Sequence, residues 1–342
     1  MIERDELAAH ASGHNAGGLN PLHGSCIPEP LGELALQSLQ LHLEHWEHIG
    51  RLSGTGRGPE PVDRLDVAGD LAEAEALRAR ATLYNHVPGF SAQWLDTAAL
   101  RALEPRMSAE LPGALRSQGN HRVDPRRHTR AVFDAAGALG ARIVHGAARG
   151  LRSADGRVTG VVLDAHTLPC DAVVIAPGPW GEQASAWLGI ELAIEPVKGE
   201  MLVAELDAGP PATDIGCGPL GVYPIDGDRV LLGGTEDRAG WDETPSASAR
   251  ERILAGIAGL APGLGEPRVI GQWAGLRPMT ADGLPIVGIA PGPENACVAT
   301  GAGRKGMLFS AGLGRAAAQL LMTGATDLAV GACTPGRMAV RA

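Results

Sequence analysis

The chain has few cysteines, and none of them are clustered. Its 342 residues include five cysteines, which lie far apart and form no CxxC pair. This spacing signals neither a zinc site nor a disulfide framework, so reduced thiols in a cytoplasmic protein are expected. No apolar run approaches the roughly eighteen residues of a membrane span, and no basic N-terminal segment precedes an apolar core. We predict a soluble, unexported protein without a metal site.

An excess of positive charge is also missing. The 29 basic residues are outnumbered by 39 acidic ones, giving a formal net charge of -10, and the basic residues are scattered. Nucleic acid and anionic membranes are therefore poor candidates as partners. The length allows two domains with separate cores. Glycine and proline are abundant, at 48 and 25 residues. Many lie where strands would pass into helices, which favours an α/β protein with ligand-binding loops.

Helices and strands alternate in the first half of the chain. Apolar periodicity and start signals predict helices over residues 31–49, 70–81 and 125–139. Short β-branched runs predict strands at residues 63–67, 141–145, 160–164 and 171–176. An Asp155-Gly156 turn before the third of these strands indicates a hairpin.

The middle of the chain differs in kind. Turn residues separate strand-like runs at residues 196–206, 221–224 and 229–234, which predicts an antiparallel sheet. Later elements are predicted as a helix over residues 247–261, a strand at 296–300, and a helix over about 304–322. Because the chain leaves one architecture and returns to it, we predict two interleaved domains.

One arginine lies in an otherwise apolar segment shaped by glycine and proline, residues 272–288. A buried guanidinium without an anion costs several kcal/mol, and its planar fork suits a carboxylate. Arg277 is therefore a candidate for binding a carboxylate ligand. The alternative is a structural ion pair, with Asp282 as one candidate partner, and the segment alone does not decide between them.

Two Gly-rich loops could hold an anion. Residues 11–18 combine small residues with Ser and Asn donors and exposed backbone N–H groups, although such clusters are more often plain turns. Residues 301–306 match GxGxxG, and Asp327 follows at about the spacing of a ribose-binding acid. We reject a dinucleotide fingerprint there, because too few residues remain for a βαβ unit. Two interpretations of residues 301–306 remain: a helix N-terminus that binds negative charge, or a segment that serves packing alone.

Several motifs follow one another along the chain. They are Glu3 with the 12–18 loop, 173–180, 196–201, 222–224 with 232–236, 275–288 and 300–308. Their order resembles that of the FAD-dependent D-amino acid oxidase (DAO) family, above all glycine oxidase and the D-amino acid dehydrogenases. The resemblance spans nearly the whole chain, and its specificity lies in the order of the motifs.

The resemblance implies an α/β fold with an FAD-binding Rossmann-like domain of the glutathione-reductase type. This domain would comprise residues 1–55, 120–182 and 270–342, interleaved with an antiparallel-sheet substrate domain of residues 56–119 and 183–269. Members of the family open with a strand, a GxGxxG turn and a helix before an acidic ribose-binding residue. Here Glu3 matches that acid, so we expect an N-terminally incomplete FAD domain from a truncated gene model, or less favourably a segment supplied by another chain.

The resemblance also implies roles for individual residues. Arg277 would clamp the substrate carboxylate, Tyr223 would add a hydroxyl, and Arg304 matches a position near the substrate entrance. Backbone N–H groups of residues 304–307 would stabilise the reduced flavin. The residues implied for FAD binding are Glu3, Ser12, Asn15, Ala16, Gly17, Ala176, Gly178, Trp180, Gly301, Gly303, Arg304, Lys305, Gly306 and Met307.

The implied activity is oxidation of the Cα–N bond of a small glycine-type or D-amino acid by hydride transfer to FAD. The imino acid would hydrolyse to a 2-oxo acid and ammonia, with oxygen or a quinone-type acceptor taking the electrons. Ala302 stands where many relatives carry histidine, which leaves the substrate range open. No cysteine stands in residues 276–278, near which the sarcosine oxidases place theirs, so FAD is expected to be non-covalent.

Alternatives to this activity stay open at the level of sequence. One is a non-catalytic remnant or subunit, and another is a flavin dehydrogenase of a secondary amine or a 2-hydroxy acid. A homo-oligomer is equally open. His42, His45 and His48 lie three residues apart on a predicted helix, where a solvated face is a simpler interpretation than a metal site. Asp282 is predicted to be a turn residue or an arginine partner.

Overall fold

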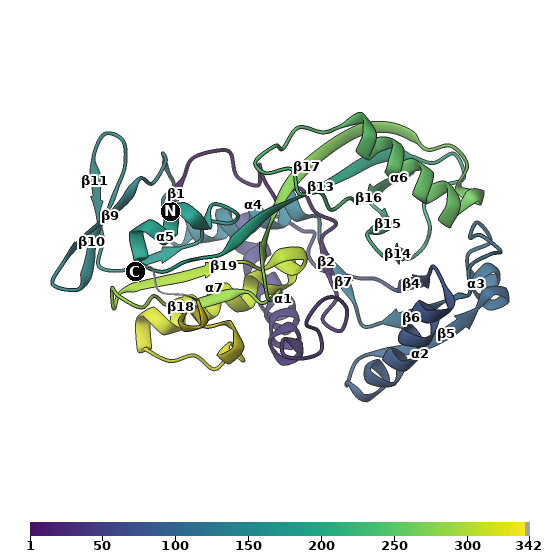
Figure 1. Ribbon diagram of the computed structural model, residues 1–342, viewed down its shortest axis with the longest axis horizontal. Helices are drawn as coiled ribbons and strands as arrows, with labels where there is room; N and C mark the ends of the chain where they lie inside the picture. Colours follow the sequence, from purple (N-terminus) through teal and green to yellow (C-terminus); the bar gives the residue numbers. More distant parts are fainter. Residues whose placement is uncertain (339–342) are drawn as a thin grey trace.

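The computed structural model describes residues 1–338. Figure 1 shows two regions joined by the long strands β13 (Ile194–Glu205) and β17 (Arg268–Thr280). These two strands pair antiparallel along nearly their whole length. One region gathers helices around small sheets, and the other is built on one large sheet.

Small sheets form the framework of the first region. Strand β12 (Val173–Ile175) pairs in parallel with β19 (Ala296–Thr300), which pairs antiparallel with β18 (Ile286–Ile289). Strand β1 (Ile2–Glu3) pairs in parallel with β8 (Val144–His145). Two antiparallel three-stranded sheets complete the set. One has β10 (Arg157–Val162) between β9 (Gly150–Ala154) and β11 (Thr167–Pro169). The other has β7 (His121–Arg122) between β2 (Gly18–Leu19) and β3 (Glu60–Pro61).

The helices of this region are α1 (Gly32–Ser53), α4 (Pro125–Ala138), α5 (Gly181–Leu188) and α7 (Gly306–Thr323). Helices α1 and α7 bury Leu34 and Phe309 in one core. A Cβ at Gly312 of α7 would overlap the Ser38 hydroxyl of α1, so glycine lets the two helices approach closely. Asp124 caps α4 by accepting the N–H of Arg127.

The second region is an eight-stranded sheet. Its strand order is β17, β13, β16 (Arg229–Gly233), β15 (Leu220–Pro224), β14 (Asp214–Cys217), β4 (Arg64–Ala68), β6 (Gly113–Gln118) and β5 (Ser91–Asp96). All neighbours are antiparallel except β14 and β4. Helix α6 (Ala247–Leu260) packs on β13, β15 and β16, while α2 (Leu71–His86) and α3 (Thr97–Leu103) pack at the other end.

Side-chain alternation gives the sheet two different faces. Leu202, Val222 and Leu232 lie in the core that includes residues of α6. The residues next to them along the strands, among them Met201 and Tyr223, line a cavity on the other side of the sheet. Because successive residues of a strand point to opposite faces, the apolar side fixes which side chains reach the cavity.

The main predicted elements are confirmed. The helices around residues 31–49, 70–81, 125–139 and 247–261 form, and the middle of the chain builds the expected antiparallel strands. The strand predicted at residues 141–145 is only Val144–His145. The rejection of a dinucleotide fingerprint at residues 301–306 is supported, because no strand follows α7 within residues 1–338. No helix in the part of the chain described here is long and apolar enough to cross a membrane.

Candidate functional site

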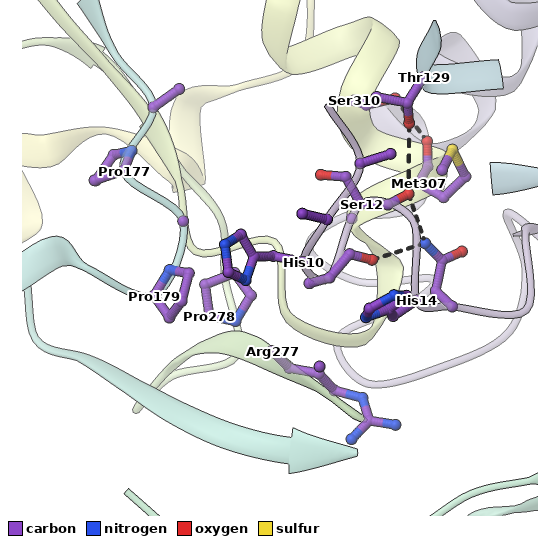
Figure 2. Close-up of a pocket in the computed structure, with 18 of the residues that line it drawn as sticks. His10, Ser12, His14, Thr129, Pro177, Pro179, Arg277, Pro278, Met307 and Ser310 are labelled. Carbon is purple, nitrogen blue, oxygen red and sulfur yellow. Dashed lines mark hydrogen bonds between the residues drawn. The ribbon is translucent and has the colours of Figure 1, made fainter. Parts of the chain in front are cut away.

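One large cavity lies between the two regions, with a volume of about 1840 Å³. Pockets for single small ligands measure roughly 300–1,000 Å³, so this cavity can take a large cofactor together with a small substrate. Its wall includes β1, the loop after β12, the start of α7, residues of the large sheet, and Arg252 and Ile253 of α6. Figure 2 shows Arg277 projecting into this space from the sheet side.

The carboxyl ends of parallel strands open into the cavity. Glu3 ends β1, Gly146 follows β8, and Ala176 follows β12; all three line the wall. Ligands of α/β proteins bind at this edge, where loops with free backbone groups meet. Two residues after Ala176, Gly178 has a φ of 56°, and its carbonyl accepts a hydrogen bond from the Thr300 hydroxyl, at 2.9 Å.

The start of α7 faces the same cavity without a side-chain cap. Gly303, Arg304, Gly306 and Met307 line the wall, and no side chain caps the first turn. Uncapped N–H groups and the positive end of the helix dipole suit negative charge. The predicted helix end at residues 304–307 is thus placed on the cavity, as sequence analysis expected.

Helix α1 supports this helix start through His42. Its Nε2 contacts the carbonyl oxygens of Met307 and Leu308 at 3.0 and 3.1 Å. Burial lowers the pKa of His42, so the ring is neutral at neutral pH and Nε2–H donates. The prediction of a solvated face was wrong for this residue, because α7 covers this face of α1, whereas His45 and His48 are exposed.

The loop of residues 11–18 uses much of its polar chemistry internally. The Asn15 amide donates to the carbonyls of Ala11 and Ser12, and its oxygen accepts the N–H of Gly17 at 2.8 Å. Ser12, Asn15, Ala16 and Gly17 all line the cavity. Asn15 thus shapes the loop, and Figure 2 shows Ser12 and His14 of this loop among the residues that line the cavity.

Arg277 lies on β17 and faces the cavity. Its Nη1 donates to the Thr235 carbonyl at 2.9 Å, and within residues 1–338 no carboxylate lies within salt-bridge distance. The ion pair with Asp282 that sequence analysis left open does not form. Asp282 instead pairs with Arg337 at 2.8 Å and accepts the N–H of Leu284, which confirms it as a turn and arginine-pairing residue.

Glycines of neighbouring strands make room for the polar side chains on this wall. A Cβ at Gly199 would overlap the Arg277 guanidinium, and one at Gly221 would overlap the Tyr223 hydroxyl. Tyr223 and Arg277 line the same cavity. Burial lowers the pKa of Arg277, but an arginine stays charged at neutral pH.

Arg304 is held by an ion pair at the rim. Its guanidinium donates twice to the Glu236 carboxylate and once to the Ser25 hydroxyl, at 3.2 Å. This hydrogen bonding by Arg304 lowers the pKa of Glu236, so the carboxylate is ionised. The pair joins the start of α7 to the loop after β16, across the cavity wall.

Trp180 is part of a cluster at the other end of the cavity. Its ring stacks on Trp241 at 6.0 Å, and the Arg4 guanidinium lies 4.7 Å above it. His10 packs edge-on against Trp180 and bridges Asp5 and Glu243 with its two nitrogens, at 2.9 and 3.0 Å. Through these contacts the loop after β16, which carries Trp241 and Glu243, packs against the N-terminal segment.

Two predicted residues lie differently from the rest. Gly301 does not line the cavity; its φ is 71°, and a Cβ there would press on the Thr280 methyl, so turn geometry and packing account for it. Lys305 turns its side chain away from the helix start, and its Nζ donates to the Asn20 carbonyl at 3.2 Å. Apart from Gly301, every predicted cofactor or substrate residue lines the same cavity, Lys305 included.

Sequence reasoning missed Arg64, His23 and Glu236, which also line the cavity. Arg64 pairs with Asp66 at 2.7 Å and is only 6% exposed. The signal available in the sequence was a charged pair, Arg64 and Asp66, inside an apolar strand. Because a buried unpaired charge is costly, two charged residues in such a strand are expected to form an ion pair or to face a cavity.

The cavity and the residues that line it indicate the general class of the protein. A space for a dinucleotide-sized group, parallel strand ends, an uncapped helix start and one carboxylate-free arginine are features of a cofactor-dependent enzyme. The family model "FAD dependent oxidoreductase" (DAO) matches residues 1–320. The chain therefore belongs to the DAO family, and it is an FAD-dependent oxidoreductase.

Similar proteins agree with this assignment. Glycine oxidase of Pseudomonas putida is 36% identical over 97% of this chain and 88% of its own length. Glycine oxidase of Geobacillus kaustophilus is 30% identical over 91% of this chain and 82% of its own. The crystal structure of that enzyme matches with a TM-score of 0.91, covering 98% of this chain and 91% of the other. D-amino acid dehydrogenase of Bradyrhizobium diazoefficiens is 32% identical over 70% of this chain and 58% of its own.

The residues present fit FAD. The cavity exceeds the size of a single small-ligand pocket, and Glu3 stands at a strand end where a ribose could be bound. The start of α7 offers N–H groups that no side chain caps. The predictions of an α/β FAD-dependent fold and of a DAO-family enzyme are confirmed.

Proposed function

We propose that the chain oxidises the Cα–N bond of a small amino acid, of the glycine or D-amino acid type. The observation that carries this proposal is Arg277, a cation on the cavity wall with no carboxylate partner in residues 1–338. Its planar fork matches the carboxylate that every amino acid brings. The similarity to glycine oxidases and a D-amino acid dehydrogenase supports the same substrate class.

In this proposal Arg277 binds the substrate carboxylate through two hydrogen bonds, and the Tyr223 hydroxyl donates to the same group. Together they turn Cα towards the start of α7. Bound FAD supplies the acceptor for the two electrons and the hydrogen that leave Cα as a hydride. As the Cα–H bond breaks, the nitrogen lone pair forms C=N and a proton leaves the nitrogen for solvent. Water then adds to the carbon, and the products are a 2-oxo acid and ammonia.

The uncapped first turn of α7 has a role in the same step. Its N–H groups and dipole face the space that a bound ring would occupy, where negative charge develops. Gly303 and Gly306 lack side chains that would hold a ring away from this backbone. No protein base needs to take the Cα hydrogen, because it leaves as a hydride, and the nearby Glu236 carboxylate is already paired with Arg304.

We also propose the cofactor set and domain division that the family resemblance implied. FAD is non-covalent and is held by the residues predicted for it, except that Gly301 acts through turn geometry and the Lys305 side chain points away from the start of α7, towards the Asn20 carbonyl. Residues 56–119 and 183–269 form the substrate-binding domain, and β17 crosses its boundary into the FAD-binding domain. Oxygen or a quinone-type acceptor reoxidises the enzyme. Acid precipitation of the purified protein should leave the flavin in the supernatant, and flavin in the pellet would contradict non-covalent binding.

Anaerobic mixing of the FAD-loaded protein with a substrate panel tests the activity. The panel contains glycine, D-alanine, sarcosine, D-proline, glycolate and D-lactate. We expect glycine or D-alanine to bleach the visible flavin bands and to yield ammonia. Bleaching by the hydroxy acids alone, or only by the secondary amines, would replace the proposed substrate class. A protein that binds FAD and is bleached by none of them would contradict the proposal.

A further inference from the structure

Four cationic side chains line the substrate end of the cavity. They are Arg277, Arg304, Arg64 and Lys305. Two of them are neutralised inside the protein, because Arg304 pairs with Glu236 and Arg64 pairs with Asp66. Within residues 1–338, Arg277 and Lys305 have no salt-bridge partner. A single α-carboxylate balances only one of these two cations.

The Lys305 ammonium lies on the cavity's inner wall, which we define by Asn20, His23, Gly24, Arg64 and Lys305. Its only hydrogen-bond acceptor among the described residues is the Asn20 carbonyl, at 3.2 Å. Its stem fills the space above Gly24, where a Cβ would meet the Lys305 Cε at 2.7 Å. A buried ammonium with one weak acceptor keeps two donors free for a ligand.

The surroundings of Lys305 carry a surplus of positive charge. Burial and the nearby Arg64 lower the pKa of Lys305 to about 7, and Arg80 adds to this effect, while Asp66 opposes it. Burial also lowers the pKa of His23 to about 3, so this ring is neutral and offers no charge. Asp66 already serves Arg64 at 2.7 Å and lies 3.5 Å from His23. The second oxygen of Asp66 has no hydrogen-bond partner among the described residues, but no described carboxylate lies within ion-pair distance of Lys305.

We infer that the inner wall is a second anion subsite, in which Lys305 binds a side-chain carboxylate of the substrate while Arg277 binds the α-carboxylate. The inference rests on the proposed function and narrows it to dicarboxylic amino acids such as aspartate and glutamate. Arg64 supports the subsite from β4. Tyr223 lines the same cavity as Arg64 and Arg277.

Two other accounts of Lys305 are less consistent with its position. A contact to the cofactor would keep the ammonium at the start of α7, but the side chain runs towards Asn20 and Arg64 instead. A purely packing role would be served by an apolar side chain, which avoids the cost of a buried amine. A lysine whose pKa is about 7 becomes fully charged when an anion binds beside it.

Substrate kinetics provide the first test, with Lys305→Met, Lys305→Arg and the surface control Arg315→Gln on the same helix. Both enantiomers of aspartate and of alanine are compared. Loss of one partner of a buried charge pair costs about 2–5 kcal/mol, so Lys305→Met should lower kcat/KM for aspartate at least ~30-fold. Alanine should change less than about threefold, Lys305→Arg should restore most of the aspartate activity, and Arg315→Gln should leave both unchanged. An equal loss for aspartate and alanine would overturn the subsite.

Binding of succinate, which has no amine to oxidise, provides a test without turnover. Calorimetry of the FAD-loaded wild type near pH 8, in two buffers of different ionisation enthalpy, measures the protons taken up. Succinate should bind at least ~10-fold more tightly than acetate and take up about one proton, because Lys305 is mostly neutral one unit above its pKa of about 7. Equal affinities, or no proton uptake with succinate, would overturn the inference even if Lys305→Met does not fold.

The outcomes separate this inference from the proposed function. If alanine or glycine bleaches the flavin while aspartate and glutamate do not, amino acid oxidation stands and the second subsite is refuted. If no amino acid bleaches the flavin, the proposed function is refuted, and the succinate measurement still decides whether Lys305 binds an anion.

Discussion

Replacing Arg277 by leucine removes the positive charge that the proposed substrate carboxylate needs. The guanidinium makes one described hydrogen bond, to the Thr235 carbonyl, and otherwise faces the cavity. Loss of one partner of a buried charge pair costs about 2–5 kcal/mol in binding. This range corresponds to a fall of roughly 30- to 4,000-fold in kcat/KM. Most of the loss should fall on KM, because the carboxylate is held in the ground state as well as in the transition state.

Folding should survive this substitution. One carbonyl loses its donor, at about 1–3 kcal/mol, while removal of a buried and uncompensated charge acts in the opposite direction. The matched control is Arg315→Leu, whose guanidinium pairs with Asp327 at the surface and is worth at most about 1 kcal/mol. Steady-state kinetics with the amino acid that bleaches the flavin, together with FAD content and Tm, complete the assay. A KM within threefold of the wild type, with FAD bound, would refute the carboxylate clamp.

Other substitutions test the surroundings of the site. Gly199→Ala places a Cβ against the Arg277 guanidinium, so KM should rise about 5- to 150-fold with FAD content unchanged, and an unchanged KM would show that the guanidinium lies elsewhere. Against the effect of burial, the hydrogen bonds that the His10 ring donates to the carboxylates of Asp5 and Glu243 raise the pKa of His10 above its ordinary value. Its stabilisation is thus complete below about pH 6.5 and is lost as pH rises through the raised pKa. The Tm gap between wild type and His10→Asn should shrink from pH 5 to 9, and a constant gap would argue against a charged His10. Phe309→Ala should lower the free energy of unfolding by about 3–5 kcal/mol in denaturant titrations, whereas the exposed Leu139→Ala should change it by under 0.5, and equal effects would contradict the described core.

Local patterns made much of the fold predictable. The spacing of apolar residues predicts the helix that begins near residue 32, and Pro125 after Asp124 indicates the start of α4. Turn residues around Asp226 separate β15 from β16 as expected. Strands β5 and β6 were not predicted, because their burial alternates with polar residues that pair only in the assembled sheet. Strand partners depend on the whole chain, which no local pattern reports.

The site was partly predictable for a similar reason. Arg277 stood out because a lone cation in an apolar segment needs an anion, and the start of α7 followed from its glycines. The roles of Gly199 and Gly221 could not be predicted, because each makes room for a side chain whose closeness only the folded sheet creates. The exposure of His42 was predicted wrongly, because the helix that covers it, α7, lies far from it in the sequence.

A crystal structure of the FAD-loaded protein with acetate tests the central claim most directly. The account predicts the acetate carboxylate on the Arg277 guanidinium and the flavin ring edge at the N–H groups of Gly306 and Met307, within one cavity. Acetate bound away from residue 277, or a flavin ring that does not reach the start of α7, would contradict it.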